Sequence, residues 1–168
     1  GLPMPDTRPL PTHDWNGDSG MRWAANLAPL DLMLEDFGNA ALAAANAQPG
    51  EHILDIGCGS GTSTFPLAEK AGTDGHVLGV DISQQLVEIA RAASPAGAPV
   101  EFRCADAATA PLPAAGFDLL FSRFGVMFFD DPVAAFTHMR GALKPGGRLA
   151  FVCWRGAQEN DWVRLPMA

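Results

Sequence analysis

From Gly50 onward, short apolar runs alternate with segments of helical spacing, and a turn separates each from the next. Five of the apolar runs have the length of buried strands: 52–56, 76–80, 100–104, 117–122 and 148–154. Three segments between them have helical periodicity: 63–71, 84–93 and 132–143. This alternation is typical of β-α-β units, so the sequence predicts an α/β fold built on a doubly wound, mostly parallel sheet.

Two of the predicted helices begin at a residue that can cap them. Ser83 precedes 84–93, and Asp131 precedes Pro132 at the start of 132–143. A serine or aspartate oxygen at this position accepts a hydrogen bond from a free backbone N–H of the first turn. The apolar residues expected to face the sheet are Leu86, Ile89, Ala90 and Ala93 in one helix and Val133, Phe136, Met139 and Leu143 in the other.

The chain before Gly50 differs in composition from the alternating part. Its first 20 residues contain four of the 14 prolines, and they predict an irregular arm because proline interrupts both helices and paired strands. Residues 21–47 are rich in Ala, Leu and Met but are broken at Pro29 and Gly38. They therefore predict short helices in series.

Composition and charge narrow the functional classes. The 168 residues are 48% hydrophobic and 18% charged, which suits one well-buried domain. A net charge of -8 without a run of basic residues disfavours nucleic acid as a partner and favours a small-molecule substrate. The scattered cysteines Cys58, Cys104 and Cys153 predict reduced thiols in a cytoplasmic protein. Apolar stretches are too short to predict a membrane span, and we expect no metal because ligand spacing is lacking.

A glycine-rich loop is the main candidate for binding chemistry. In the segment ILDIGCGSGTST, residues 53–64, glycines alternate between a predicted strand and a predicted helix. Glycine permits a positive φ and leaves room for a ligand at the backbone, and the helix start offers free N–H groups. Asp81 ends the next strand, at a spacing that brings a carboxylate to the ribose hydroxyls of an adenosine. The alternatives are a tight turn without a ligand and, for Asp81, an acid that favours a helix start.

A dinucleotide is the competing ligand for this loop. The dinucleotide fingerprint G-x-G-x-x-G has a third glycine where this chain has Thr62. Asp55, just ahead of the loop, would also repel a pyrophosphate. The pattern therefore fits an adenosine without pyrophosphate better than it fits a nicotinamide dinucleotide.

Five motifs in order resemble the class I S-adenosylmethionine-dependent methyltransferases, in particular small-molecule members of the type 11 kind. They are LDIGCGSG, VLGVDIS, CADAATAPLP, FDLLFSRFGVMFF and ALKPGGRLAFVCW. The resemblance implies a Rossmann-like sheet with seven strands in the order 3-2-1-4-5-7-6. The chain supplies the first five, and we expect the sixth and seventh to be missing.

The resemblance also implies roles for individual residues. Asp55, Gly57 and Gly59 would contact the methionine part of the cofactor, Asp81 the ribose, and Asp106 with Ala107 the adenine. The remaining members of the implied cofactor-binding set are Cys58, Ile82, Ser122, Arg123 and Phe124. The structural alternatives are a capped turn for Asp106, a solvated side chain for Arg123 and a core position for Phe124.

The arm HDWNGDSGMRW is similar to the start of family members in which an N-terminal helix closes over the cofactor. We therefore divide the chain into a covering segment 1–48, an S-adenosylmethionine-binding domain 49–154 and the start of a missing C-terminal portion 155–168. Trp15, Trp23 and Phe128 are the candidate substrate contacts, although packing on the domain is an equally good role for a tryptophan.

The implied reaction is an in-line methyl transfer from S-adenosylmethionine to a small-molecule acceptor. It requires no nucleophilic side chain, so no catalytic residue is assigned. His13, Asp14 and His138 are the candidates for a base if the acceptor must lose a proton. A non-catalytic cofactor-binding or partner subunit and a nicotinamide-dependent oxidoreductase are the alternative functions.

The end of the chain raises a separate question. A fifth strand with an uncovered edge, 149–154, would expose unpaired backbone groups. We expect that edge to be covered by a second copy of the chain, by the folded-back tail containing Trp162, or by a continuation of the polypeptide. A homo-oligomer formed through the fifth strand is therefore one possible assembly.

Overall fold

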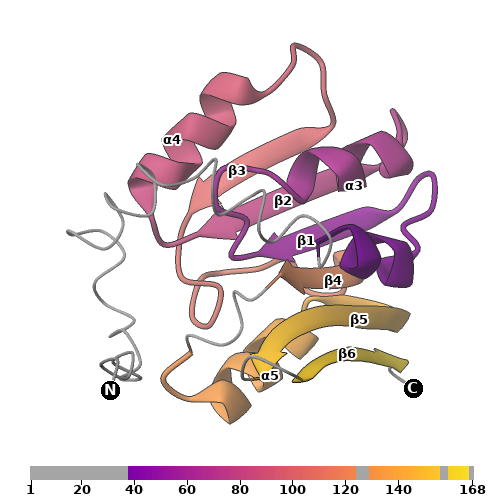
Figure 1. The fold of residues 1–168 in the computed structure, drawn as a ribbon, viewed down its shortest axis with the longest axis vertical. Coiled ribbons are helices and arrows are strands. Elements are labelled where there is room, and N and C mark those ends of the chain that lie inside the picture. Colours follow the sequence, from indigo (N-terminus) through magenta and orange to yellow (C-terminus); the bar gives the residue numbers. More distant parts are fainter. Residues whose placement is uncertain (1–37, 124–128, 156–158, 167–168) are drawn as a thin grey trace, which may run out of the picture.

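The structure is a computed structural model that describes residues 38–123, 129–155 and 159–166 (Figure 1). Its strands are β1 His52–Ile56, β2 His76–Asp81, β3 Val100–Cys104, β4 Phe117–Arg123, β5 Leu143–Arg155 and β6 Glu159–Pro166. Its helices are α3 Thr64–Ala71, α4 Gln84–Ala93 and α5 Pro132–Arg140, and residues 38–45 are also helical.

The six strands form one sheet in the order β3-β2-β1-β4-β5-β6. All neighbours from β3 to β5 are parallel, and β6 runs antiparallel to β5. β1 is central and pairs with β2 on one side and β4 on the other, so the order reverses beside it. The carboxyl ends of the strands flanking such a reversal are the usual ligand site of an open α/β sheet. The predicted α/β, mostly parallel fold is confirmed.

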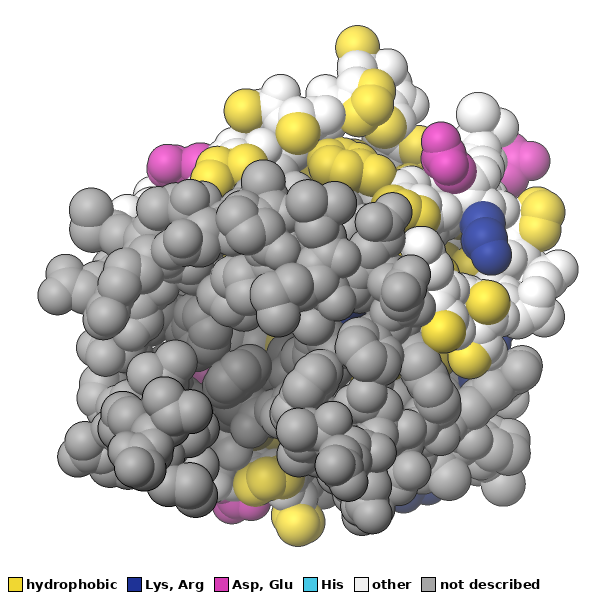
Figure 2. Space-filling view, viewed as in Figure 1, with side chains coloured by type: hydrophobic (Ala, Val, Ile, Leu, Met, Phe, Trp, Pro, Cys, Tyr) yellow, Lys and Arg dark blue, Asp and Glu magenta, His cyan; other side chains and the backbone are white. Residues whose placement is uncertain are grey.

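Helices cover both faces of the sheet because its central strands are apolar on both sides. Ile53 packs with α3 and the helix 38–45, whereas Leu54 and Ile56 pack with α5 on the opposite face. α4 packs on the outer strands through Val87 and Ala90. Figure 1 shows α3 and α4 in front of β1 to β3. On the face seen in Figure 2, charged side chains of the described residues lie scattered, with no basic patch among them.

The last strand corrects two expectations. Of the two strands expected to be missing, one place in the sheet is filled, because β6 pairs antiparallel with β5 from Arg148 to Arg155. β6 thus occupies the place that the expected order gives to its seventh strand. The folded-back tail is the arrangement found, since Trp162 pairs with Val152 in register. β5 is no longer an edge, which removes the reason given for a homo-oligomer through it.

The helix boundaries were predicted well at their starts and less well beyond. Ser83 Oγ accepts from Leu86 N (3.4 Å) and Asp131 Oδ1 from Ala134 N (3.1 Å), so both predicted caps are confirmed. α5 ends at Arg140, three residues early, because Leu143 already belongs to β5 and pairs with Phe117. Among the described residues, no helix has the length and the apolar content that crossing a membrane requires.

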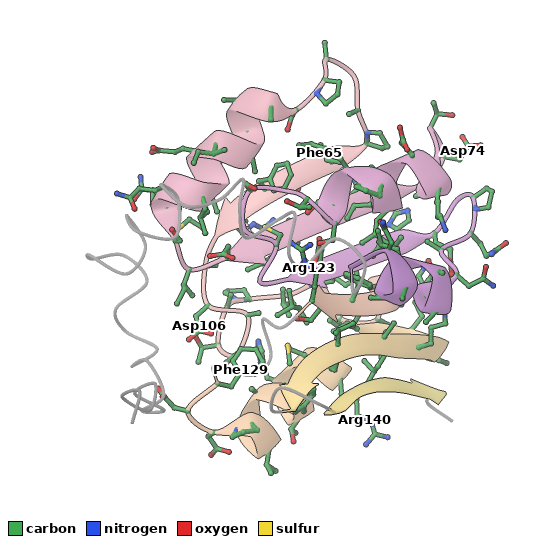
Figure 3. The ribbon with its side chains drawn as sticks, in the orientation of Figure 1. Phe65, Asp74, Asp106, Arg123, Phe129 and Arg140 are labelled. Carbon is green, nitrogen blue, oxygen red and sulfur yellow. The ribbon has the colours of Figure 1, made fainter. Side chains whose placement is uncertain are left out.

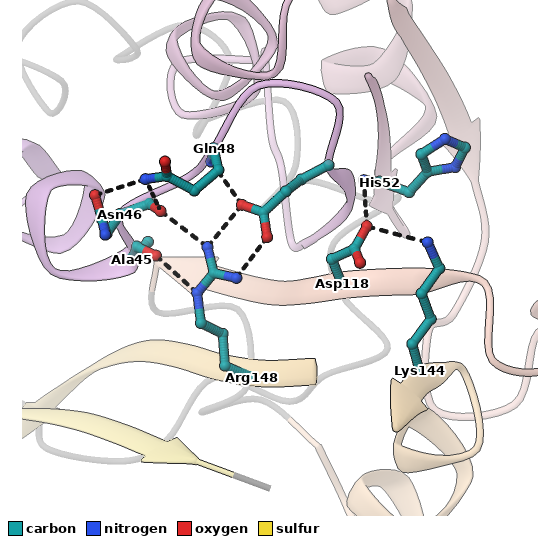
Figure 4. A network of polar contacts seen from close by, with 8 residues as sticks. Ala45, Asn46, Gln48, His52, Asp118, Lys144 and Arg148 are labelled. Carbon is teal, nitrogen blue, oxygen red and sulfur yellow. Dashed lines mark hydrogen bonds and ion pairs between the residues drawn. The ribbon is translucent and has the colours of Figure 1, made fainter. Parts of the chain in front are cut away.

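One ion pair ties the helix 38–45 to the sheet at the amino ends of the strands (Figure 4). The guanidinium of Arg148 in β5 binds both carboxylate oxygens of Glu51, at 2.6 and 2.8 Å. It also donates to the carbonyls of Ala45 (3.0 Å) and Asn46 (2.9 Å), where the helix ends. A cation suits the free carbonyls of a helix C-terminus. The pair therefore holds three chain segments together.

Candidate functional site

The glycine loop connects β1 to α3 at the carboxyl end of the sheet. Gly57 N and Cys58 N both donate to Val80 O, at 2.8 and 3.1 Å, which ties the loop to the end of β2. Gly59 and Gly61 have φ values of +55° and +94°, a region that glycine tolerates best. A Cβ on Gly61 would lie 2.7 Å from Phe65, whereas a Cβ on Gly59 would meet none of the described residues within 4 Å. Packing therefore requires glycine at position 61, whereas no described residue fills the space beside Gly59.

Asp55 lies beneath this loop and is fully buried. Its Oδ2 accepts from Ser63 Oγ and Thr64 Oγ1, both at 2.8 Å. Its Oδ1 has no hydrogen-bond partner among the described residues. Burial raises the pKa of Asp55 to about 6, and the donors and the charge of Arg123 oppose the rise only partly. An ionised carboxylate with an unused oxygen can accept a hydrogen bond from a cationic ligand group.

Asp81 connects the glycine loop to the start of α4. Its Oδ2 accepts from Gly59 N (2.9 Å) and its Oδ1 from Ser83 N (2.8 Å). Burial raises its pKa, and these two backbone bonds counteract that effect. Asp81 thus precedes a helix, which is the alternative considered for it, and it also contacts the loop at the place where the ribose is expected. Each carboxylate oxygen has two acceptor sites, so further hydrogen bonds to a ligand are available.

The segment after β3 brings Asp106 to the same end of the sheet (Figure 3). Asp106 is exposed, and its Oδ1 accepts from Ala108 N at 2.9 Å, which is the capped turn considered above. The side chain of Ala107 is 4% exposed and belongs to the core, so only its backbone can reach a ligand. Ile82 is half-buried, and its carbonyl accepts from Cys104 Sγ at 3.6 Å.

Three other residues of the implied set make structural contacts. Cys58 is 3% exposed and packs with Phe102, so its thiol faces the core and only its backbone belongs to the loop. Ser122 is buried and donates to Ile56 O at 2.8 Å. Arg123 is half-buried, and a Cβ on Gly38 would lie 3.0 Å from its Nη1, so its side chain packs on the helix 38–45 (Figure 3). The structure thus places Arg123 at the site, not in bulk solvent.

Some candidates lie outside the described residues, and some contacts were not foreseen. Those outside are Trp15, Trp23, His13, Asp14, Phe124 and Phe128. Ser63 and Thr64 were not assigned as partners of Asp55, although two hydroxyl residues directly after a glycine loop are a usable signal. His138, the candidate base within the described residues, is exposed, and its Nε2 is hydrogen-bonded to Ala110 O at 2.6 Å.

Comparisons with known proteins agree with this geometry. Residues 53–147 match the model of a methyltransferase domain. The chain is 41% identical over 104 residues to aklanonic acid methyltransferase DauC of Streptomyces sp. (strain C5), covering 61% of this chain and 47% of that protein. It is 38% identical over 122 residues to phosphoethanolamine N-methyltransferase 1 of Arabidopsis thaliana, covering 72% of this chain and 23% of that protein.

A solved structure gives the same result in three dimensions. The S-adenosylmethionine dependent methyltransferase from Mesorhizobium loti superposes with a TM-score of 0.64 at 27% identity, over 74% of this chain and 62% of that one. The chain spans half or less of the length of the two curated relatives. The matched region contains the glycine loop, Asp81 and Asp106.

Proposed function

Because the chain belongs to the methyltransferase domain family, we propose that it is the cofactor-binding part of an enzyme that transfers a methyl group from S-adenosylmethionine to a small-molecule acceptor. The observation that carries the proposal is the bond from Gly59 N to Asp81 Oδ2, made where the Cβ direction of Gly59 is open. It places a carboxylate beside backbone that a ligand can approach closely.

The described residues fit the parts of this cofactor. The Oδ1 of Asp55, which none of the described residues contacts by a hydrogen bond, suits the ammonium of the methionine moiety, because a buried carboxylate needs a cationic or hydrogen-bonding partner. Asp81 suits the two ribose hydroxyls, which both donate. Asp106 and the backbone of Ala107 suit the adenine, whose amino group donates to a carboxylate. The backbone N–H groups of Gly57 and Cys58 donate to Val80 O and position the loop, so we propose that these two residues contact the ligand through other backbone atoms.

The cofactor supplies an activated methyl group on a sulfonium, which leaves as a neutral thioether. The chain's own residues bind and orient, and no side chain has to act as a nucleophile. Burial raises the pKa of Asp55 to about 6, and a cationic ligand beside its carboxyl would favour the ionised form. The hydroxyls of Ser63 and Thr64 hold its Oδ2, which leaves Oδ1 to fix the ligand's orientation.

Binding of the cofactor without methyl transfer is the second candidate function. It is a candidate because this chain spans only part of the length of its relatives. This chain spans 47% of the aklanonic acid methyltransferase, so acceptor contacts can lie in sequence beyond this chain. We propose that residues 1–48 cover the cofactor and that Trp15, Trp23, Phe124 and Phe128 contribute apolar contacts near the acceptor. We also propose a cytoplasmic location, where the free thiols of Cys58 and Cys104 stay reduced.

The test is calorimetric titration of the chain with S-adenosylhomocysteine, together with thermal melting. A ligand that binds only the folded state raises the melting temperature. Heat of binding and a thermal shift support the proposal. Folded protein that gives neither at millimolar ligand contradicts it, and a shift with NADH instead would favour an oxidoreductase. Methyl transfer to an acceptor panel then distinguishes an enzyme from a binding module.

A further inference from the structure

The turn that holds Asp106 is built mainly from its own backbone. Asp106 O accepts from Thr109 N (3.1 Å) and Ala110 N (2.8 Å), and Asp106 Oδ1 accepts from Ala108 N (2.9 Å). Three hydrogen bonds within five residues make a compact unit. The carbonyl of Ala110 and the carboxylate of Asp106 therefore move together. A contact that fixes the carbonyl also orients the carboxylate.

α5 provides the surface on which this turn rests. Ala107 shares a buried cluster with Ala135 and Met139, the two buried residues of α5. Apolar contacts set the distance between the turn and the helix, but they have little directional preference. The angle between the turn and the helix is therefore fixed by polar contacts.

His138 makes a polar contact of this kind. It lies in the last turn of α5, and its Nε2 is 2.6 Å from Ala110 O, 28 residues away along the chain. A carbonyl only accepts, so the ring donates from Nε2 whether the imidazole is neutral or charged. The far end of the same loop is held by backbone bonds, from Ala115 N to Gly141 O and from Gly116 N to Ala142 O. Of these three bonds to α5 and the residues after it, only the one from His138 is made by a side chain.

We propose that His138 is a positioning residue for the purine ring of the cofactor, holding the Asp106–Ala107 turn at the angle at which Asp106 meets the ring's exocyclic amino group. The inference rests on the proposed function, because it takes Asp106 to be the adenine contact. His138 itself touches no ligand group in this account. It acts through Ala110 and the three hydrogen bonds of the turn.

The test compares three single variants by titration with two ligands, S-adenosylhomocysteine and its inosine analogue, which lacks the amino group. His138→Ala removes the donor. His138→Gln keeps a donor at nearly the same reach, because the amide nitrogen of glutamine lies about as far from Cα as Nε2 does. Arg140→Ala is the matched control, an exposed residue in the same helical turn.

We expect His138→Ala to weaken binding of S-adenosylhomocysteine about three- to tenfold, as for loss of one hydrogen bond. Binding of the inosine analogue should change little, so the preference for adenine falls. His138→Gln should restore that preference, and Arg140→Ala should leave it unchanged. A purely structural role would not alter this ratio.

The outcomes separate this inference from the function on which it rests. If the parent chain fails to bind S-adenosylhomocysteine, the proposed function fails first. If the parent binds and His138→Ala keeps the adenine preference, the positioning role is wrong. A His138→Ala variant that does not fold, or that loses both ligands equally, would make His138 a stability contact and would also overturn the proposal.

Discussion

Gly59→Ala separates the strain of the glycine loop from its use as a ligand surface. Gly59 has a φ of +55°, and within the part of the chain that the structure describes a Cβ there would meet no atom closer than 4 Å. Gly97, between α4 and β3, has a φ of +76° and equally open surroundings. Substitution by alanine should therefore cost a similar amount of stability at both positions, but only Gly59 lies beside the proposed ligand. Gly97→Ala is the matched control.

The expected loss of stability is small and similar for both variants. A positive φ costs a non-glycine residue roughly 1–2 kcal/mol. The reduced freedom of the unfolded chain offsets about 0.4–1 kcal/mol of this. The net loss is therefore about 1 kcal/mol, which lowers the melting temperature of a chain of this length by about 2–4 °C.

The effect on binding should differ between the variants. The added methyl group of Gly59→Ala projects into the space proposed for the cofactor, so we expect at least about tenfold weaker binding of S-adenosylhomocysteine, or about 1.4 kcal/mol. Gly97→Ala should bind as the parent does. Calorimetric titration at a temperature where both variants are folded measures the difference. Equal dissociation constants for the two variants would refute the argument that Gly59 faces the ligand.

Three further predictions follow from the charged groups. Asp81→Asn should weaken binding of S-adenosylhomocysteine by about 1.5–3 kcal/mol, because the charged acceptor of the ribose hydroxyls is lost; titration measures it. Burial raises the pKa of Asp55 from 3.8 to about 6, so its proton is held more tightly in the folded state. The contribution of Asp55 to the free energy of unfolding should therefore fall by about 2–3 kcal/mol as pH rises from about 4 to 6. The difference between the parent and Asp55→Asn in urea denaturation measures this contribution. Arg148→Met should cost about 2–4 kcal/mol of stability, because it leaves Glu51 partly buried without its cation.

Each of these predictions has a contrary result. Unchanged affinity in Asp81→Asn would leave Asp81 as an acid that precedes a helix and nothing more. Stability that rises from pH 4 to 6 equally in the parent and in Asp55→Asn would show that other groups dominate the titration. For the ion pair, the control is Lys144→Met. Lys144 pairs with Asp118, which is more exposed than Glu51, so this variant should lose less than about 1 kcal/mol of stability. Equal losses in the two variants would show that burial does not decide the strength of the pair.

Local patterns in the sequence were enough for most of the sheet. β1 and β3 have the predicted bounds, 52–56 and 100–104, because β1 is mostly apolar, β3 alternates apolar with charged residues, and a turn follows each. The caps at Ser83 and Asp131 were also predictable, since capping depends on a few consecutive residues. The glycine loop and Asp81 could be identified because their spacing reflects a contact between neighbouring strands.

Helix faces were predicted less well. Ile89 and Val133 were expected to face the sheet, but they are 39% and 77% exposed, and Val87 and Ala135 are buried instead. Helical spacing defines a stripe only to within about one residue. Which side of the helix is buried depends on how it crosses the strands beneath it. The apolar periodicity of the helix does not determine the angle at which the helix crosses the strands.

Tertiary structure decided the features that join distant parts of the chain. The polar segment Glu159–Pro166 becomes a strand because β5 presents a row of unpaired backbone groups, and pairing satisfies these whatever the side chains are. Arg148 meets Glu51, and His138 meets Ala110, across 97 and 28 residues. The sequence by itself determined the first four strands, the starts of the three helices between them and the place of the glycine loop, because those choices rest on neighbouring residues. The edge of the sheet, the partners of the buried charges and the support of the Asp106 turn depend on contacts that exist only once the chain has folded.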